Sequence, residues 1–446
     1  MTLYTYRKKS DELILYFNRD FMIENDSQKI QALFWKYTID GCVNIYMSSS
    51  KDLEYSPLHD EISLDSSENI HTDLTVIKNH KKAVFWIDGY SLEKIEKAIQ
   101  DTMEFIEFAE FDEDIILPQI TDSQEKDFST FDSKDISFQD LKNEFLKCKN
   151  FPFEKNISIE AFSIWVSNTI HYYINSLWSV KIQKDNGAFY YLEIFGENNE
   201  KRETHYKYTS TKEKPMIEVK MIQQLQQELL FKISDSQTIF HPWVYDITLD
   251  RDVVIDFLDV ILWNLWAESM REWVSLFSKN KLWDKIFSTN FTLINNPDLK
   301  NYTGNLVFDK EWITAKKTIL FDKWVLNSKF YDYKNALKEW LQYLWNSSIS
   351  NIEFEGAMRS DYLFGSKILF TNLMAFHTVD AITGKFSLQG EWYILENGEK
   401  KDYIKNINLS GDIIHLFSHI KCLWDDYKTD GNFRVPSISF QDQKIV

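Results

Sequence analysis

The order of apolar and polar residues predicts alternating strands and helices in the first half of the chain. Residues 32–47 read as strands around a turn at Asp40-Gly41, and residues 82–87 form a short apolar strand. Ser91 precedes apolar residues spaced three and four apart, which predicts a helix capped by this serine. The same pattern predicts helices over 137–148 and 220–231, strands over 157–182 and 188–196, and an exposed polar connection over 120–136.

The second half is predicted to consist mainly of strands. A boundary is expected near residues 233–238, and a long helical pattern follows over 250–279. Asn397-Gly398 has the composition of a hairpin turn, and residues 411–424 are predicted to be helical. The predicted strands of this half are 291–296, 304–312, 316–326, 366–376 and 384–396.

These elements predict an α+β protein of two domains. The N-terminal α/β domain is expected to span residues 1–235. The C-terminal domain, residues 236–446, is expected to be rich in β-strands and to begin with the long helix.

The charge and composition exclude several classes of protein. The chain has 50 basic and 68 acidic residues, so its net charge is 50 − 68 = −18, and a chain this acidic repels phosphate backbones. Gly (12) and Pro (7) are too few for collagen-like or Pro-rich chains, and a hydrophobic content of 44% excludes general disorder. We therefore expect a globular protein that does not bind nucleic acid.

The sequence predicts a cytoplasmic location. The first residues lack the apolar stretch of a signal peptide. The most apolar run, 253–266, is too short to cross a bilayer and contains two aspartates. The three cysteines, Cys42, Cys148 and Cys422, are widely spaced and odd in number, which favours reduced thiols and no membrane association.

Few residues carry a recognisable chemical signature. The common nucleotide-binding, hydrolase and zinc-protease motifs are missing from the sequence. His415 and His419 lie four apart on a predicted helix, a spacing that can bind a metal, although such pairs more often flank a packed helix face. Both interpretations stay open, and the first would make the protein a hydrolase with a metal at these histidines. His377 taken alone is an ordinary structural histidine.

The C-terminal region is similar to a known family. Residues 377–388 read H-x-V-x-x-x-T-G-K-F-S-L and are followed by Gly390, YILENGE, INLSGD and, at 436–440, PSISF. Upstream, NFTLINNP (290–297) and ILFDKWVL (319–326) continue the pattern in the same order. This series resembles the TldD/PmbA family, the paired subunits of a bacterial metallopeptidase. The resemblance implies the two-domain fold and a role in cleaving peptides.

The chain departs from the zinc-bearing member of that pair. The resemblance places the family's HExxxH motif near residues 258–263, where Leu258 and Trp263 stand at the histidine positions and Asp259 replaces the glutamate. A catalytic zinc needs three protein ligands, and residues 427–446 contain no cysteine. The resemblance therefore implies the non-catalytic, PmbA or TldE type of subunit, with no catalytic or metal-binding residues and with zinc expected in the partner.

Two turns lack the glycine that the family pattern carries. The sequences DKEW (309–312) and NSLW (175–178) have tryptophan where the family has glycine. Glycine tolerates a positive φ, so tryptophan at these places predicts reshaped turns or filled cavities.

The resemblance suggests a heterodimer with an HExxxH-bearing TldD-like subunit. The complex would cleave peptides, for example to remove a leader from a modified peptide. The alternative is a stand-alone peptide- or protein-binding module. Residues 368–376 form an apolar strand whose edge could hold an extended peptide by strand addition. The candidate peptide-binding residues are Thr371, Asn372, Leu373 and His377. The other interpretation is a buried strand paired on both sides, with His377 hydrogen-bonded inside the fold.

Overall fold

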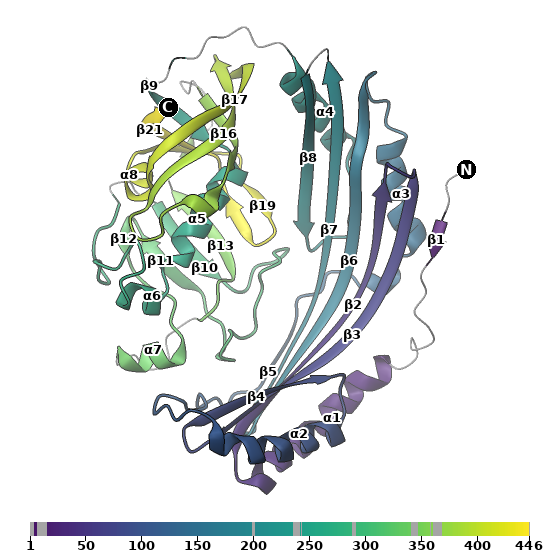
Figure 1. Cartoon of the computed structure of the whole chain (residues 1–446), viewed down its shortest axis with the longest axis vertical. Coiled ribbons are helices and arrows are strands. Elements are labelled where there is room, and N and C mark those ends of the chain that lie inside the picture. The colour runs from purple at the N-terminus through teal and green to yellow at the C-terminus, as the bar shows by residue number, and fades with distance from the viewer. Residues whose placement is uncertain are drawn as a thin grey trace.

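The computed structural model shows a long curved sheet beside a second, more compact β-rich unit (Figure 1). It describes residues 4–6, 16–198, 201–234, 241, 243–287, 291–339, 347–356, 358–359 and 368–445. Helices make up 24% and strands 45%, so the predicted α+β class is confirmed.

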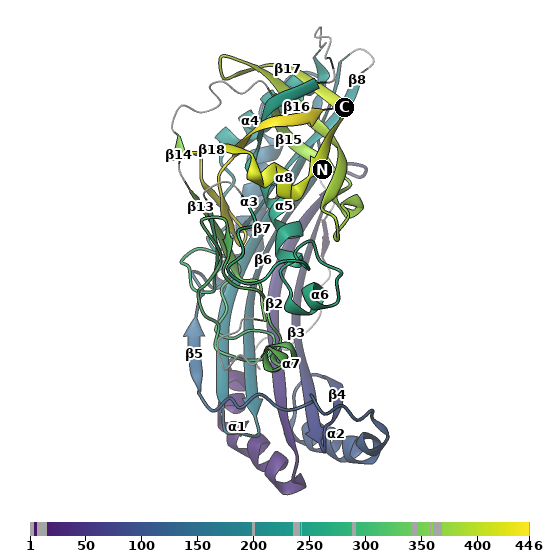
Figure 2. The same ribbon diagram turned by 90° about the vertical axis from the view of Figure 1, so that its left-hand side faces the viewer.

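The first sheet has eight strands and draws on residues up to 211. β2, β3, β6 and β7 are each 17 to 19 residues long and pair antiparallel, so they span the whole length of the sheet (Figure 2). The strands are β1 (Tyr4–Tyr6), β2 (Asp40–Ser56), β3 (Glu61–Lys78), β4 (Lys81–Asp88), β5 (Gln124–Asp127), β6 (Ile157–Asn175), β7 (Val180–Asn198) and β8 (Lys201–Thr211).

Four helices cover one face of this sheet. Alternate residues of its strands are apolar and point to this face, so the helices bury them. Val43 and Ile45 of β2 pack with the buried faces of the first two helices, and Leu192 of β7 packs with those of the next two. The helices are α1 (Tyr16–Tyr37), α2 (Leu92–Phe105), α3 (Phe138–Lys149) and α4 (Val219–Ile233). Ser91 caps α2 as predicted, and Ser137 forms a capping box with Asp140 at the start of α3.

The C-terminal unit is built from two further sheets. In the seven-stranded sheet, β9 (Trp243–Leu249) pairs with both β15 (Ile368–Met374) and β21 (Ile438–Ile445), so five of its strands close into a ring. The other strands of this sheet are β14 (Met358–Arg359), β16 (Lys385–Glu396), β17 (Glu399–Asp412) and β18 (Ile420–Trp424). The six-stranded sheet contains β10 (Phe291–Asn296), β11 (Thr318–Asp322), β12 (Val325–Leu326), β13 (Asn351–Gly356), β19 (Lys428–Asp430) and β20 (Phe433–Val435).

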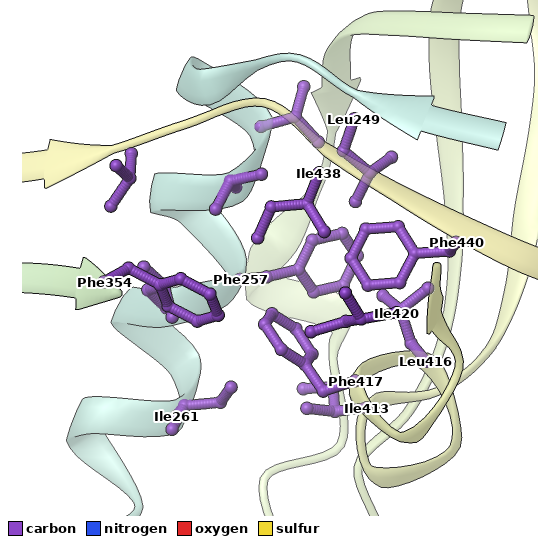
Figure 3. Packing of buried hydrophobic residues seen from close by; sticks show 14 of the residues in the cluster. Leu249, Phe257, Ile261, Phe354, Ile413, Leu416, Phe417, Ile420, Ile438 and Phe440 are labelled. Carbon is purple, nitrogen blue, oxygen red and sulfur yellow. The ribbon is translucent and has the colours of Figure 1, made fainter. Parts of the chain in front are cut away.

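The core of this unit surrounds α5 (Arg251–Trp263). Phe257 of α5 makes edge-on ring contacts with Phe386 and Phe417, and Figure 3 shows it among side chains from both sheets. The shorter helices α6 (Ala267–Arg271), α7 (Tyr333–Lys338) and α8 (Ile413–Ser418) complete the unit.

Several predicted elements are wrong. Residues 32–37 belong to α1, and Asp40-Gly41 begins β2 and is not a turn. The predicted helix 250–279 ends at Trp263, because the Asn264 amide accepts a hydrogen bond from the Leu276 N–H and reverses the chain.

Three further predictions also differ from the structure. The predicted helix 411–424 stops at Ser418 and continues as β18, which pairs with β21. The connection 120–136 contains β5, and 304–312 forms only an isolated bridge between Phe308 and Thr314. Parts of the expected boundary (235–238) and of the strand 366–376 (366–367) lie outside the described residues.

The two units contact each other at both ends of the long sheet. At one end, Lys232 of α4 forms an ion pair with Glu391 of β16 at 2.6 Å, and Lys207 of β8 pairs with Asp252 of α5 at 3.3 Å. At the other end, Tyr173 and other buried residues of the sheet pack against Val307 and Phe308. The face of the sheet opposite its helices is therefore turned toward the C-terminal unit.

Candidate functional site

The zinc motif of the family resemblance falls on α5, and its residues do not fit a metal. Leu258 and Leu262 are fully buried in the core, Asp259 is exposed, and Trp263 is 63% exposed. Neither the two leucines nor the tryptophan has a nitrogen or oxygen atom suited to binding zinc. We therefore derive no zinc-dependent step from this helix.

The polar face of α5 instead carries three carboxylates, Asp252, Asp256 and Asp259. Burial, together with the charges of the other two, raises the pKa of Asp256 from 3.8 to about 7. Asp252 is held by Lys207 of β8, so this face of α5 points toward the long sheet.

The predicted peptide-binding strand is β15, and its two edges differ along its length. Ile368 to Phe370 pair with β9 on one side and β16 on the other. The pairing with β9 ends where the Asp250 N–H donates to the Phe370 carbonyl, and the chain then enters α5. Asn372 and Leu373 pair with β16 alone in the described pairings. Thr371 and Asn372 are half-buried, and Leu373 is buried in the core.

His377 lies just beyond this strand, in the short 3₁₀ helix η3 (Phe376–Thr378). Its side chain is exposed, which does not fit a histidine hydrogen-bonded inside the fold. The preceding residue, Phe376, packs edge-on against Phe257 of α5 with ring centroids 5.0 Å apart. The structure thus brings His377, the open part of β15 and α5 into one neighbourhood.

His415 and His419 lie elsewhere, on α8. Their rings stack with centroids 4.0 Å apart, and His419 Nδ1 is 2.7 Å from the His415 carbonyl oxygen, in the position to donate to it. Within the described part of the chain, no group of three or more His, Cys, Asp or Glu side chains is placed to hold a metal ion. The pair flanks a helix whose other side, Leu416 and Phe417, is packed in the core.

Sequence reasoning missed a row of rings on the face of the long sheet opposite its helices. Phe189 and Tyr191 of β7 stand beside Tyr206 and Tyr208 of β8, and we call these four residues the aromatic face. Tyr206 is 45% and Tyr208 is 41% exposed. The sequence signal is the spacing of two between Phe189 and Tyr191 and between Tyr206 and Tyr208, because residues i and i+2 of a strand share a face.

The comparisons with known proteins agree with the two-unit architecture. Residues 242–446 match the family described as PmbA/TldA metallopeptidase C-terminal domain. Metalloprotease PmbA of Escherichia coli O157:H7 is 25% identical over 180 residues, and the PmbA homologue of Buchnera aphidicola is 26% identical over 179 residues. Each match covers 38% of this chain and 39% of the relative, so it spans about two-fifths of the relative's length.

Solved structures share nearly the whole fold. TldE from Thermococcus kodakarensis superposes with a TM-score of 0.81 at 16% identity and covers 95% of this chain and 99% of its own. A Bacteroides thetaiotaomicron protein, described as a candidate modulator of DNA gyrase, gives a TM-score of 0.84 at 21% identity and covers 95% and 98%. At these identities the likeness shows the fold alone.

The fold and the C-terminal match define a metallopeptidase-related protein of two units. More specifically, the C-terminal unit is similar in sequence to PmbA and TldD proteins, and the whole chain shares the fold of TldE, so the chain resembles the TldD/PmbA/TldE family.

Proposed function

We propose that this chain is the non-catalytic subunit of a heterodimeric TldD/TldE-type zinc metallopeptidase that cleaves peptides. Its partner carries HExxxH and the zinc ion. Leader removal from a modified peptide is one reaction of this class.

The observation that carries the proposal is the composition of α5. The resemblance places the family's zinc histidines at Leu258, which is buried in the core, and at Trp263, which is 63% exposed, and neither side chain can bind zinc. If α5 corresponds to the family's zinc helix, as the resemblance implies, it lacks the residues that bind zinc. A subunit of this kind contributes to hydrolysis through assembly and substrate binding.

The proposed role in holding the peptide substrate rests on β15. Beyond Phe370 its described pairing is with β16 alone, and α5 packs alongside, so an extended peptide could add to this edge through main-chain hydrogen bonds. Thr371 and Asn372 lie on the segment in question, and the exposed His377 at its end could orient a peptide carbonyl.

We also propose a cytoplasmic location. Cys42 and Cys148 are free thiols, and all three cysteines, Cys422 included, are buried, which suits a reducing compartment. The described helices include none with the length and apolar character needed to span a bilayer.

Co-expression tests the proposal. The chain is produced with the HExxxH-bearing relative encoded in the same genome, sized by chromatography with light scattering, and assayed on a mixed peptide library. We expect a heterodimer whose activity requires the partner's HExxxH glutamate, and an interface of more than about 2,000 Å² if the complex is permanent. The chain purified alone should contain no stoichiometric zinc by elemental analysis.

Two outcomes would overturn the proposal. A chain that stays monomeric with its relative at micromolar concentration, yet binds peptides, is the stand-alone binding module. One zinc ion per chain that is lost in His415→Ala or His419→Ala makes the protein a hydrolase with its own metal site.

A further inference from the structure

The aromatic face is a continuous surface across β7 and β8. Tyr206 and Tyr208 rings lie 6.5 Å apart with planes inclined by 22°, and Tyr191 and Tyr206 rings lie 5.7 Å apart at 30°. Phe189 extends the row at 6.5 Å from Tyr208. The small angles between their planes make these rings nearly parallel, so together they form one aromatic surface in front of the sheet. An aliphatic stem or a cation binds well against such a surface.

Carboxylates lie on the same face of the sheet, toward β2 and β3. Through the strand register, Asp52 of β2 is opposite Asp65 of β3 on one side and Trp165 of β6 on the other. Glu54, two residues further along β2, lies on the same face and is opposite Ser163 of β6, which is opposite Tyr191 of β7. Glu54 is therefore two strands from Tyr191, which is about 10 Å at the usual strand spacing.

Like charges directly opposite each other destabilise a sheet, so the carboxylates of Asp52, Asp65 and Glu54 favour the binding of a cation between them. Burial, followed by the charges of Asp65 and Glu54, raises the pKa of Asp52 to about 6. A bound ammonium or guanidinium group would relieve both effects.

Further carboxylates approach the aromatic face from the C-terminal unit. Asp252 of α5 pairs at 3.3 Å with Lys207, which stands between Tyr206 and Tyr208 on β8, so the carboxylates of α5 lie beside this strand. Burial raises the pKa values of Tyr206 and Tyr208, and the charges of Asp252 and Asp256 add to the increase. Glu193 of β7 accepts a hydrogen bond from the Tyr191 hydroxyl at 2.9 Å and shares the same face. The rings therefore lie between two groups of negative charge.

We propose that the aromatic face binds a Lys- or Arg-bearing segment of an extended peptide. The aliphatic stems and cationic groups of the peptide lie on the tyrosine rings, and the charges meet Asp52 and Glu54 on one side and Asp256 on the other. This rests on the proposed function only in treating the peptide as a substrate, because binding itself needs no partner subunit.

The charge pattern selects this occupant over the alternatives. A phosphate backbone or an anionic lipid surface would face carboxylates at both borders of the rings, together with a net charge of −18. A neutral apolar peptide would gain from the rings but would leave the opposed carboxylates Asp52 and Asp65 unrelieved.

A binding measurement on the full chain alone tests the proposal. A short fluorescein-labelled peptide of alternating Lys and Thr is titrated by fluorescence anisotropy, beside peptides in which Glu or Gln replaces each Lys. We expect the Lys peptide to bind most tightly and the Glu peptide not to bind. Its affinity should fall as salt rises, because exposed charges are screened.

Variants on two different elements locate the site. Tyr206→Ala with Tyr208→Ala should weaken the Lys peptide roughly tenfold, from two lost cation–π contacts. Asp52→Asn with Glu54→Gln should weaken it and flatten its salt dependence. The matched controls are Phe108→Ala, an aromatic side chain that is 88% exposed on η1 (Ile106–Phe108), and Glu93→Gln on α2.

Equal binding of the Lys and Glu peptides, or unchanged binding by both double variants, would overturn the proposal. The test is independent of the proposed function. If the chain binds the Lys peptide selectively without any partner, the peptide-binding role of the aromatic face is supported even if no heterodimer forms. If the heterodimer is active but the chain does not bind the Lys peptide, only the role of the aromatic face is refuted.

Discussion

At the residue scale, five tryptophans have a backbone conformation that normally requires glycine. Trp178, Trp273, Trp283, Trp312 and Trp324 have φ between 62° and 75° among the described residues. Two of them end the turns NSLW and DKEW, so those turns keep the glycine conformation and are not reshaped as predicted. Trp312 fills space, since its ring stacks on Tyr173 at 5.0 Å.

Replacing such a tryptophan by glycine should stabilise the protein. The left-handed conformation costs a side-chain-bearing residue about 1–2 kcal/mol, and glycine avoids this cost. Trp273→Gly and Trp283→Gly, which remove exposed side chains, should each raise the free energy of unfolding by about 1 kcal/mol in urea titrations. Trp86→Gly, in the extended strand β4, is the control and should lower it.

The composition leads to a prediction about the natural protein. The sequence has 15 Trp and 12 Gly, whereas about 7% glycine is usual, or roughly 31 residues in 446. We predict that protein isolated from its own host carries glycine at Trp178 and Trp312, through a codon that the host reads as glycine. Peptide mass spectrometry of that protein decides the matter, and tryptophan at both positions would refute the prediction. The aromatic face contains no tryptophan, so its argument is unaffected.

Asp256 gives a pH-dependent stability. Its pKa in the folded protein, about 7, lies above its ordinary value of 3.8, so folding favours the protonated form. The stability it contributes is complete below pH 4 and is lost as the pH rises through 7. Asp256→Asn, which cannot ionise, should therefore match the wild type near pH 4. At pH 8 it should be more stable by about 1–2 kcal/mol, with allowance for solvent screening. A difference that is the same at both pH values would contradict this origin, and Glu93→Gln serves as the control.

At the scale of elements, the features that depend on neighbouring residues were predicted correctly, and those that depend on distant contacts were not. The Ser91 cap, the helix starting after Ser137 and the Asn397-Gly398 turn were all found, because each depends on residues a few positions apart. The helices predicted over 250–279 and 411–424 were too long because side-chain and strand contacts from distant residues end them. The edge of β15 could not be predicted either, since its partner β9 lies more than a hundred residues earlier.

The β15 neighbourhood yields a prediction for the assembled complex. His377 is exposed at the end of the strand, and its removal deletes no buried contact. His377→Ala should reduce the peptidase activity of the complex several-fold while leaving its size on chromatography unchanged. His415→Ala, an exposed histidine on α8, is the control and should leave activity unchanged. Unchanged activity in His377→Ala would remove this residue from the peptide site, and loss of assembly would show a structural role.

At the scale of the whole molecule, the position of the aromatic face depends on how the two units are held together. Within the part of the chain that the structure describes, Lys232 of α4 and Glu391 of β16 form the most buried ion pair across this interface, with side chains 5% and 14% exposed. Lys232 also lies 5.7 Å from the Tyr403 ring. Removing one member of a buried pair leaves the other without its counter-charge, which costs far more than removing both.

Lys232→Met should accordingly lower the free energy of unfolding by about 3 kcal/mol, whereas Lys232→Met with Glu391→Leu should recover most of that loss. Urea unfolding followed by both tyrosine fluorescence and far-UV circular dichroism measures the two variants. If the pair holds the units in place, the single variant should also weaken binding of the Lys peptide, because Asp256 then moves relative to Tyr206. Equal destabilisation by the single and double variants would show that packing around these side chains, and not their charge pairing, joins the units.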